Sequence, residues 1–196
     1  LETEVWNPGL QVEFGSSDLV VVRGAVNFER LDEPLPVSSE VSIPVGDYDF
    51  NNVTFQYSFG SQRRVSGSFS FRIGEFYDGT IRTVRYNRGR ISVTNQLSLE
   101  PSVSFNDVKV PAGDFTTNVF GLRADWAFTP LMFVGGLVQY DSDSDSFSSN
   151  LRFRWEYAPG SEFFAVYTDE LTTVGSGFPK LQNRAFALKI NRLLRF

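Results

Sequence analysis

Seven charged residues occupy alternate positions in segments whose intervening side chains are largely apolar: Arg72, Glu100, Arg123, Asp125, Arg152, Arg154 and Glu156. In a β-strand, alternate side chains point to the same face, so these charges are expected on a polar face opposite an apolar one. Around an enclosed lumen they would form a constriction that selects solutes by charge. They could instead pair with one another and support the wall of a narrow barrel. The sequence leaves both interpretations open.

The segment 141–146 alternates Asp and Ser, and places three carboxylates at Asp141, Asp143 and Asp145. Oxygen-rich loops can bind Ca²⁺. The spacing lacks the central Gly and the distal Glu of an EF-hand loop, so these residues are only a weak calcium candidate. A solvated external loop is the favoured interpretation, and no metal site is predicted.

The chain contains no Cys and no His. This composition excludes thiolate zinc sites and Cys nucleophiles, and it removes the most common general base. No G-x-S-x-G motif is present. We therefore predict that the protein is not an enzyme, with no catalytic residues and no cofactor. The net charge of −5 argues against a nucleic-acid partner.

Period-two alternation runs through almost the whole chain and predicts eleven strands. The clearest is 147–157, where Phe153 and Trp155 share one face and Arg152 and Arg154 the other. The expected strands are 3–14, 18–30, 48–59, 65–76, 80–92, 96–107, 117–128, 131–140, 147–157, 162–169 and 184–196. Most reach the roughly 9–11 residues that a transmembrane strand needs. The predicted fold is an all-β antiparallel transmembrane β-barrel, with residues 1–196 as a single region of a barrel of twelve or more strands.

Composition agrees with a membrane barrel better than with a helical membrane protein. The chain is 41% hydrophobic, its mean hydropathy is −0.17, and no run of about 18 apolar residues exists. Aromatic residues make up 15%. Such barrels carry aromatic girdles at both membrane interfaces. The residues expected there are Phe14, Trp126, Trp155, Tyr157 and Phe196.

The predicted connections alternate between long and short, and only the 77–79 turn is shorter than its place in this alternation predicts. The segments 31–47, 108–116 and 170–183 are expected as long external loops, while 15–17, 93–95 and 158–160 are expected as short periplasmic turns. Eleven strands with a periplasmic carboxy terminus put Leu1 on the external side. Single-chain bacterial barrels have an even strand number, so at least one upstream strand or a partner chain is expected to close the sheet.

Four segments carry a family resemblance: SNLRFRWEYAPGSEFFAVY at 149–167, GFPKLQNRAF at 177–186 with LLRF at 193–196, FYDGT at 76–80 and PAGDFTT at 111–117. They resemble the carboxy-terminal barrel region of a bacterial surface-protein family of unknown function, whose members carry an amino-terminal domain similar to family 9 carbohydrate-binding modules. The resemblance implies an outer-membrane location. It also implies that the insertion machinery reads the last strand, which ends at Phe196. It implies no catalytic residues.

Three functional hypotheses remain. The leading one is an outer-membrane barrel that serves as a pore, or as an anchor for a carbohydrate-related module. The second is a soluble β-sandwich or lipocalin-like binding protein, in which Phe55, Phe71, Phe153 and Trp155 would be buried. The third is a barrel subunit of a larger surface complex. The location of those four aromatic side chains separates the first hypothesis from the second.

Overall fold

A computed structural model describes residues 2–174 and 179–194. The protein is all-β and its sheets are antiparallel. The strands are β1 (Thr3–Trp6), β2 (Gly9–Glu13), β3 (Leu19–Leu31), β4 (Leu35–Pro36), β5 (Ser42–Ile43), β6 (Gly46–Phe59), β7 (Val65–Phe76), β8 (Gly79–Ser92), β9 (Leu97–Val110), β10 (Gly113–Thr129), β11 (Met132–Asp141), β12 (Ser146–Ala158), β13 (Ser161–Thr172) and β14 (Lys180–Asn191). In the described ranges, no helix is long and apolar enough to cross a bilayer.

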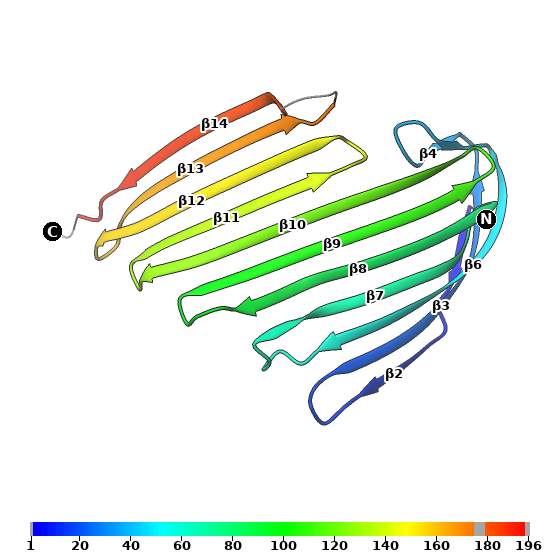
Figure 1. Ribbon diagram of the computed structural model, residues 1–196, viewed down its shortest axis with the longest axis horizontal. Coiled ribbons are helices and arrows are strands. Elements are labelled where there is room, and N and C mark those ends of the chain that lie inside the picture. The colour runs from blue at the N-terminus through cyan, green and yellow to red at the C-terminus, as the bar shows by residue number, and fades with distance from the viewer. Residues whose placement is uncertain (1, 175–178, 195–196) are drawn as a thin grey trace. The chain divides into compact units, whose positions relative to one another are not determined.

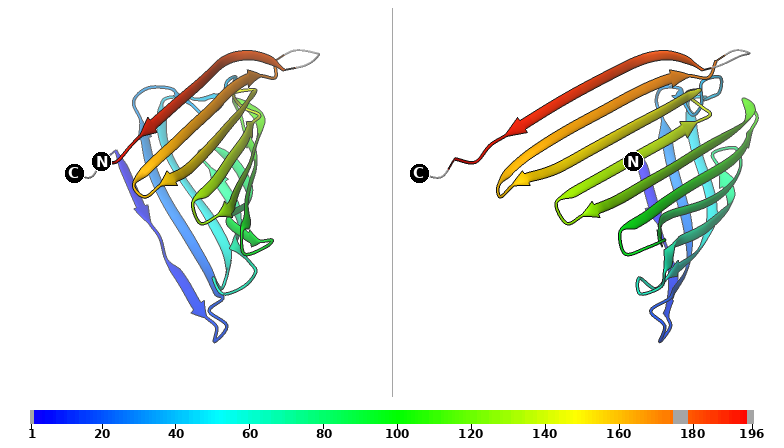
Figure 2. Two further views of the ribbon diagram at one scale, coloured as in Figure 1. Left: turned by 90° about the vertical axis from the view of Figure 1, so that its left-hand side faces the viewer. Right: turned by 60° about the vertical axis from the view of Figure 1, so that its left-hand side comes forward.

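Twelve of these strands form one sheet that follows the chain as a meander. The hydrogen-bonded order is β1-β3-β6-β7-β8-β9-β10-β11-β12-β13-β14, and β2 also pairs with β3 (Figure 1). The chain divides into two compact units, Leu1–Gly89 with Ser102–Val119, and Arg90–Pro101 with Phe120–Phe196. Within the second unit, β11 to β14 lie side by side in chain order (Figure 2).

All eleven predicted strands are present, and the first of them is interrupted. The segment 3–14 forms β1 and β2, which both pair with β3 and are separated by Asn7 and Pro8. Proline has no backbone N–H to donate to a sheet ladder, which explains the break. The last strand, predicted to reach residue 196, ends at Asn191. The predicted terminal signal at Phe196 lies outside the described residues.

The prediction of a long loop at 108–116 is wrong. β9 continues to Val110 and β10 begins at Gly113, so only Pro111 and Ala112 connect them. Gly113 adopts a φ of 144°, which a residue with a side chain rarely adopts. Val108 and Val110 are 2% and 6% exposed, so burial of these residues extends β9 beyond the predicted boundary. The expected long–short alternation therefore fails at this connection.

Strand register separates an apolar face from a polar face in each unit, because directly opposed residues of an antiparallel pair share a face. In the first unit, Val22 opposes Phe55, which opposes Phe71. In the second unit, Leu151 opposes Tyr167, which opposes Phe186. The intervening residues form the polar face. The predicted alternation is therefore confirmed at the level of register.

The buried apolar core of the described residues is small and lies on the polar face of the first unit. It comprises Leu31, Val41, Ile43, Phe50, Tyr77, Ile81, Val108 and Val110. The predicted long loop 31–47 supplies Val41 and the fully buried Ile43, through the short β4–β5 hairpin. Phe50 precedes Asn52 by two residues on β6, so both point to the polar face. The hairpin thus packs onto the polar face at one end of the strands rather than extending away from it.

Asp18 joins the β2–β3 turn to the β6–β7 turn. It is 4% exposed, and it accepts hydrogen bonds from the Gly60 backbone N–H at 2.8 Å, from Ser16 Oγ at 2.8 Å and from Arg63 Nε at 3.1 Å. The Gly60 N–H in particular, with smaller contributions from Ser16 and Arg63, holds the pKa of Asp18 well below its usual range.

This contact gives the stability of the first unit a pH dependence. Because the folded-state pKa is depressed, the stabilisation is fully present above the unfolded-state pKa of about 4 and is lost as pH falls below it. We expect Asp18→Asn to lower the free energy of unfolding at pH 7 and to flatten its acid dependence. Denaturant unfolding at pH 7 and at pH 3 measures both effects. A variant that keeps the wild-type acid dependence would contradict this role.

Candidate functional site

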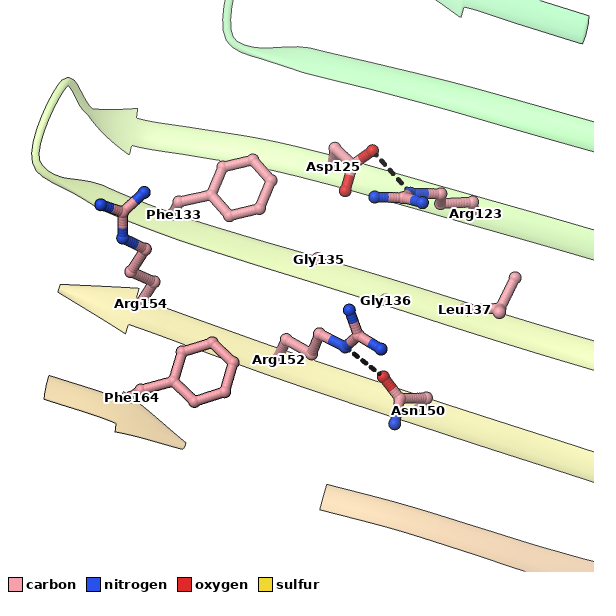
Figure 3. Close-up of a pocket in the computed structure, with 10 residues that line it drawn as sticks. All are labelled: Arg123, Asp125, Phe133, Gly135, Gly136, Leu137, Asn150, Arg152, Arg154 and Phe164. Atoms are coloured by element: carbon pink, nitrogen blue, oxygen red, sulfur yellow. Dashed lines mark hydrogen bonds and ion pairs between the residues drawn. The ribbon is translucent and has the colours of Figure 1, made fainter. Parts of the chain in front are cut away.

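A groove of about 260 Å³ lies on the polar face of the second unit (Figure 3). Register explains its position. Phe133 opposes Arg154, Gly135 opposes Arg152, and Arg154 also opposes Phe164. Arg123 and Asp125 on the neighbouring strand β10 complete the lining. Four strands therefore contribute side chains to one hollow.

Gly135 keeps the groove open. A Cβ atom at this position would lie 3.0 Å from Asp125 Oδ1 and 3.5 Å from the Phe133 ring. The bare backbone of Gly135 therefore lies between Arg152 and Asp125, and the rings of Phe133 and Phe164 lie toward the Arg154 end of the groove (Figure 3). The groove thus combines two aromatic rings with charged side chains, which is a common composition for a small-molecule site.

Each arginine of the groove already has an acceptor on the same face. Arg123 Nε donates to Asp125 Oδ2 at 2.9 Å, and Arg152 Nε donates to Asn150 Oδ1 at 2.9 Å (Figure 3). Arg154 pairs with Glu162, through a 3.0 Å bond from Nε to Oε1. Such half-exposed ion pairs contribute at most about 1 kcal/mol each. The arrangement resembles a supported wall more than a constriction with free charges, although Arg152 has only a neutral partner.

The seven predicted charged residues do not form one cluster. Arg123, Asp125, Arg152 and Arg154 meet in the groove. Glu100 lines a neighbouring cavity of the second unit together with Asp125 and Arg90. Glu156 accepts a hydrogen bond from the Gly160 N–H at 3.0 Å, in the β12–β13 turn. Arg72 lies in a separate cavity of the first unit.

Four of the five predicted interfacial aromatic residues lie within the described ranges, and these four are exposed and lie in or near turns. Trp126 is 45% exposed and stacks on Phe128, with ring centroids 4.0 Å apart, close to the end of β10. Trp155 and Tyr157 are 42% and 39% exposed and lie near the end of β12. Phe14 is exposed in the β2–β3 turn. Phe196 lies outside the described residues.

The acidic segment does not form a metal cluster in the described part of the chain. Asp141 Oδ1 accepts a hydrogen bond from the backbone N–H of Asp143 at 2.9 Å, so the first carboxylate caps its own turn. Asp145 has a φ of 47° within this turn. Across residues 2–174 and 179–194, no group of three or more His, Cys, Asp or Glu side chains could hold a metal ion.

Sequence reasoning missed the polar cavity in which Arg72 lies. Its other cationic members are Arg23 and Arg85, and Asn52 and Thr83 lie in its lining. These residues come from four strands that span about sixty residues of sequence. Register brings them together, since Arg23 opposes Thr54 and Thr54 opposes Arg72, and the sequence alone carries no signal of that register.

No family model matches the chain, and no curated protein or solved structure matches it.

Proposed function

We propose that this chain forms part of the wall of a bacterial outer-membrane β-barrel that conducts solutes. The apolar face contacts lipid, and the polar face lines an aqueous lumen. The observation that carries the proposal is the exposure of the apolar faces: Phe55 is 48% and Trp155 is 42% exposed, and Phe71 and Phe153 are partly exposed. None of these four aromatic side chains is buried, and Leu151 on the same face is 51% exposed. A soluble sandwich or lipocalin-like protein would bury these side chains under a second layer or inside the barrel.

Strand length and aromatic placement support the same conclusion. The strands β6 to β10 are 12 to 17 residues long, which is enough to cross a bilayer at a tilt of about 45°. Trp126, Trp155 and Tyr157 lie near strand ends, as interfacial aromatic residues do. On the edge strand β14, where both faces are exposed, the apolar Phe186, Leu188 and Ile190 alternate with Ala187 and Lys189, which fits a strand presented to lipid and to the insertion machinery.

The pairing order has β1 and β2 at one end and β14 at the other. In hydrocarbon each unpaired backbone group costs several kcal/mol, so the proposal requires that these edges be paired. Pairing of the two edges with one another, with further strands or with a strand of a partner chain would satisfy this requirement. The barrel subunit of a larger complex is one form of the same proposal.

The experiment is reconstitution into phospholipid vesicles. We expect the protein to float with vesicles in a density gradient, to migrate differently on gels before and after heating, and to raise the conductance of planar bilayers. Flotation without conductance would overturn the pore and leave a membrane anchor. A protein that stays folded and monodisperse without detergent, and does not float, would overturn the membrane location itself.

A further inference from the structure

The polar face of the first unit carries a second cavity, of about 280 Å³, whose charges are of one sign. The guanidinium groups of Arg23, Arg72 and Arg85 line it, and its lining contains no carboxylate. We propose that this cavity binds a tetrahedral oxyanion, phosphate or sulfate, either free or as a monoester of a small solute. The proposal deepens the proposed function, and rests on it, by assigning a solute class to the polar face.

The three arginines differ from Arg123 and Arg154 of the groove in the second unit because no acid neutralises them. Arg72 Nε donates to the amide oxygen of Asn52 at 3.1 Å, and Arg85 Nε donates to Ser104 Oγ at 3.2 Å. Within the described ranges, no carboxylate lies within ion-pair distance of Arg23, Arg72 or Arg85. Three positive charges thus share one hollow with only neutral partners, and a bound anion would compensate them.

Two buried polar groups in the same lining are the independent sign of a ligand. Asn52 is 5% exposed and Thr83 is 2% exposed. The Asn52 Nδ2 and the Thr83 Oγ1 have no hydrogen-bond partner. The amide oxygen of Asn52 already accepts from Arg72, so its Nδ2 offers only donors. A buried donor without an acceptor is costly, and native structures rarely leave one unsatisfied.

The donor inventory selects the ligand. Guanidinium groups donate and never accept, the free Asn52 group is a donor, and the Thr83 hydroxyl can donate. The ligand must therefore be rich in acceptors and negatively charged. A tetrahedral oxyanion presents three or four oxygens in different directions, whereas a carboxylate presents two in one plane. Donors that arrive from separate strands fit the first geometry better.

Register places two of these donors in one row across three strands of the polar face. Arg23 opposes Thr54, and Thr54 opposes Arg72, so the two arginines lie two strand spacings apart, about 10 Å between Cα atoms. Their long side chains extend from the sheet on either side of the short Thr54. Arg85 and Thr83 on β8 complete the lining from the next strand. The cavity is large enough for more than a bare ion, which favours a monoester.

The small core explains why the unpaired groups are buried. Asn52 follows the buried Phe50 by two residues on β6, and Thr83 follows the buried Ile81 by two residues on β8. Both polar residues therefore border the core that the β4–β5 hairpin completes through Ile43. The β4–β5 hairpin would cover one end of the cavity with apolar side chains, and the arginines beside it would attract an anion. Together they would slow the passage of an anion through this part of the lumen.

The test measures phosphate and sulfate binding to the folded protein by calorimetry at low ionic strength. Removal of one charged hydrogen-bonding partner costs about ten- to a hundredfold in affinity, and Arg72→Gln should weaken phosphate binding by that factor. Arg64→Gln is the matched control. It removes the same positive charge, but from the exposed β6–β7 turn and not from the cavity. Arg72→Lys keeps the charge but loses the two-pronged geometry, so it should weaken binding less than Arg72→Gln.

Thr83→Val separates a ligand contact from a structural role. The substitution removes a buried hydroxyl that has no partner, so it should leave the free protein as stable as before or more stable, while it weakens phosphate binding. A Thr83→Val protein with reduced stability and unchanged binding would assign the hydroxyl to folding and contradict the proposal.

Binding and flotation together separate failure of the anion site from failure of the membrane proposal. Wild-type protein that floats with vesicles but binds neither phosphate nor sulfate would overturn the anion site and leave the membrane proposal intact. Acetate binding as tight as phosphate binding would overturn the tetrahedral assignment. Equal phosphate affinity in the wild type and in Arg72→Gln would place the anion elsewhere. Protein that fails to float fails the proposed function, whatever it binds.

Discussion

Replacement of Ile43 by alanine is expected to lower the free energy of unfolding of the first unit by about 2–5 kcal/mol, the usual cost of truncating a fully buried aliphatic side chain. Ile43 is 0% exposed, and it is the most deeply buried residue of the β4–β5 hairpin in the core that the hairpin forms with the sheet. Loss of its methyl groups leaves a cavity between the hairpin and the sheet, because neither side can close fully around the gap. The hairpin should then detach from the polar face more often.

Limited proteolysis reports this detachment directly. A glutamate-specific protease would cleave after Glu40, which lies in the hairpin between β4 and β5. We expect Ile43→Ala to speed this cleavage markedly, since cleavage follows the population of the open form. Val45→Ala is the matched control, because Val45 is 56% exposed on the same segment. Equal cleavage of the two variants would show that the hairpin is not held by Ile43.

Replacement of Leu151 by arginine is expected to destabilise the membrane-inserted protein by about 2–4 kcal/mol, the cost of a cation on the lipid face of a barrel near the bilayer midplane. Leu151 is 51% exposed at the middle of the apolar face, opposite Gly136 and Tyr167. In a soluble protein, an exposed leucine could be replaced by arginine within about 0.5 kcal/mol. The substitution therefore separates a face covered by lipid from a face covered by water.

Ser148→Arg is the control for Leu151→Arg. Ser148 lies on the same strand but on the polar face, where it opposes Gln139 and Glu170. An arginine there would lie beside a carboxylate, so stability should change little. Denaturant unfolding in phospholipid vesicles measures both variants. Two equal effects would contradict the assignment of the faces, and two negligible effects would favour a soluble protein.

The faces of the strands could be predicted because their information is local. In the segment 147–157, odd-numbered residues are expected on one face of the strand and even-numbered residues on the other. The register of β12 with its two neighbours confirms this assignment. Strand ends are different, because a connection depends on what the flanking residues touch. Pro111 to Asp114 read as a loop, yet Val108 and Val110 are buried in the core and extend the ladder to a two-residue turn.

The charged sites could be predicted only in part, for a related reason. Arg123 and Asp125 stand in β10, and Arg152 and Arg154 stand in β12 on the other side of β11; both strands alternate clearly, and the four residues do meet. Arg23, Arg72 and Arg85 stand in strands whose relative register the sequence does not show. The segment 80–92 is also ambiguous, because its four arginines occupy both odd and even positions and so do not define a polar face. Which arginines have a carboxylate partner is a property of register, and only the folded sheet reveals it.

The most direct test of the central claim compares one tryptophan on each face. Trp155 lies on the apolar face, and Phe164 lies on the polar face, one strand away. The first protein keeps Trp155 and carries Trp6→Phe and Trp126→Phe, and the second adds Trp155→Phe and Phe164→Trp. In vesicles of brominated lipid we expect strong quenching of the fluorescence from Trp155 and little from the tryptophan at position 164. Equal fluorescence from the two, with no quenching of Trp155, would show that the apolar face does not contact lipid.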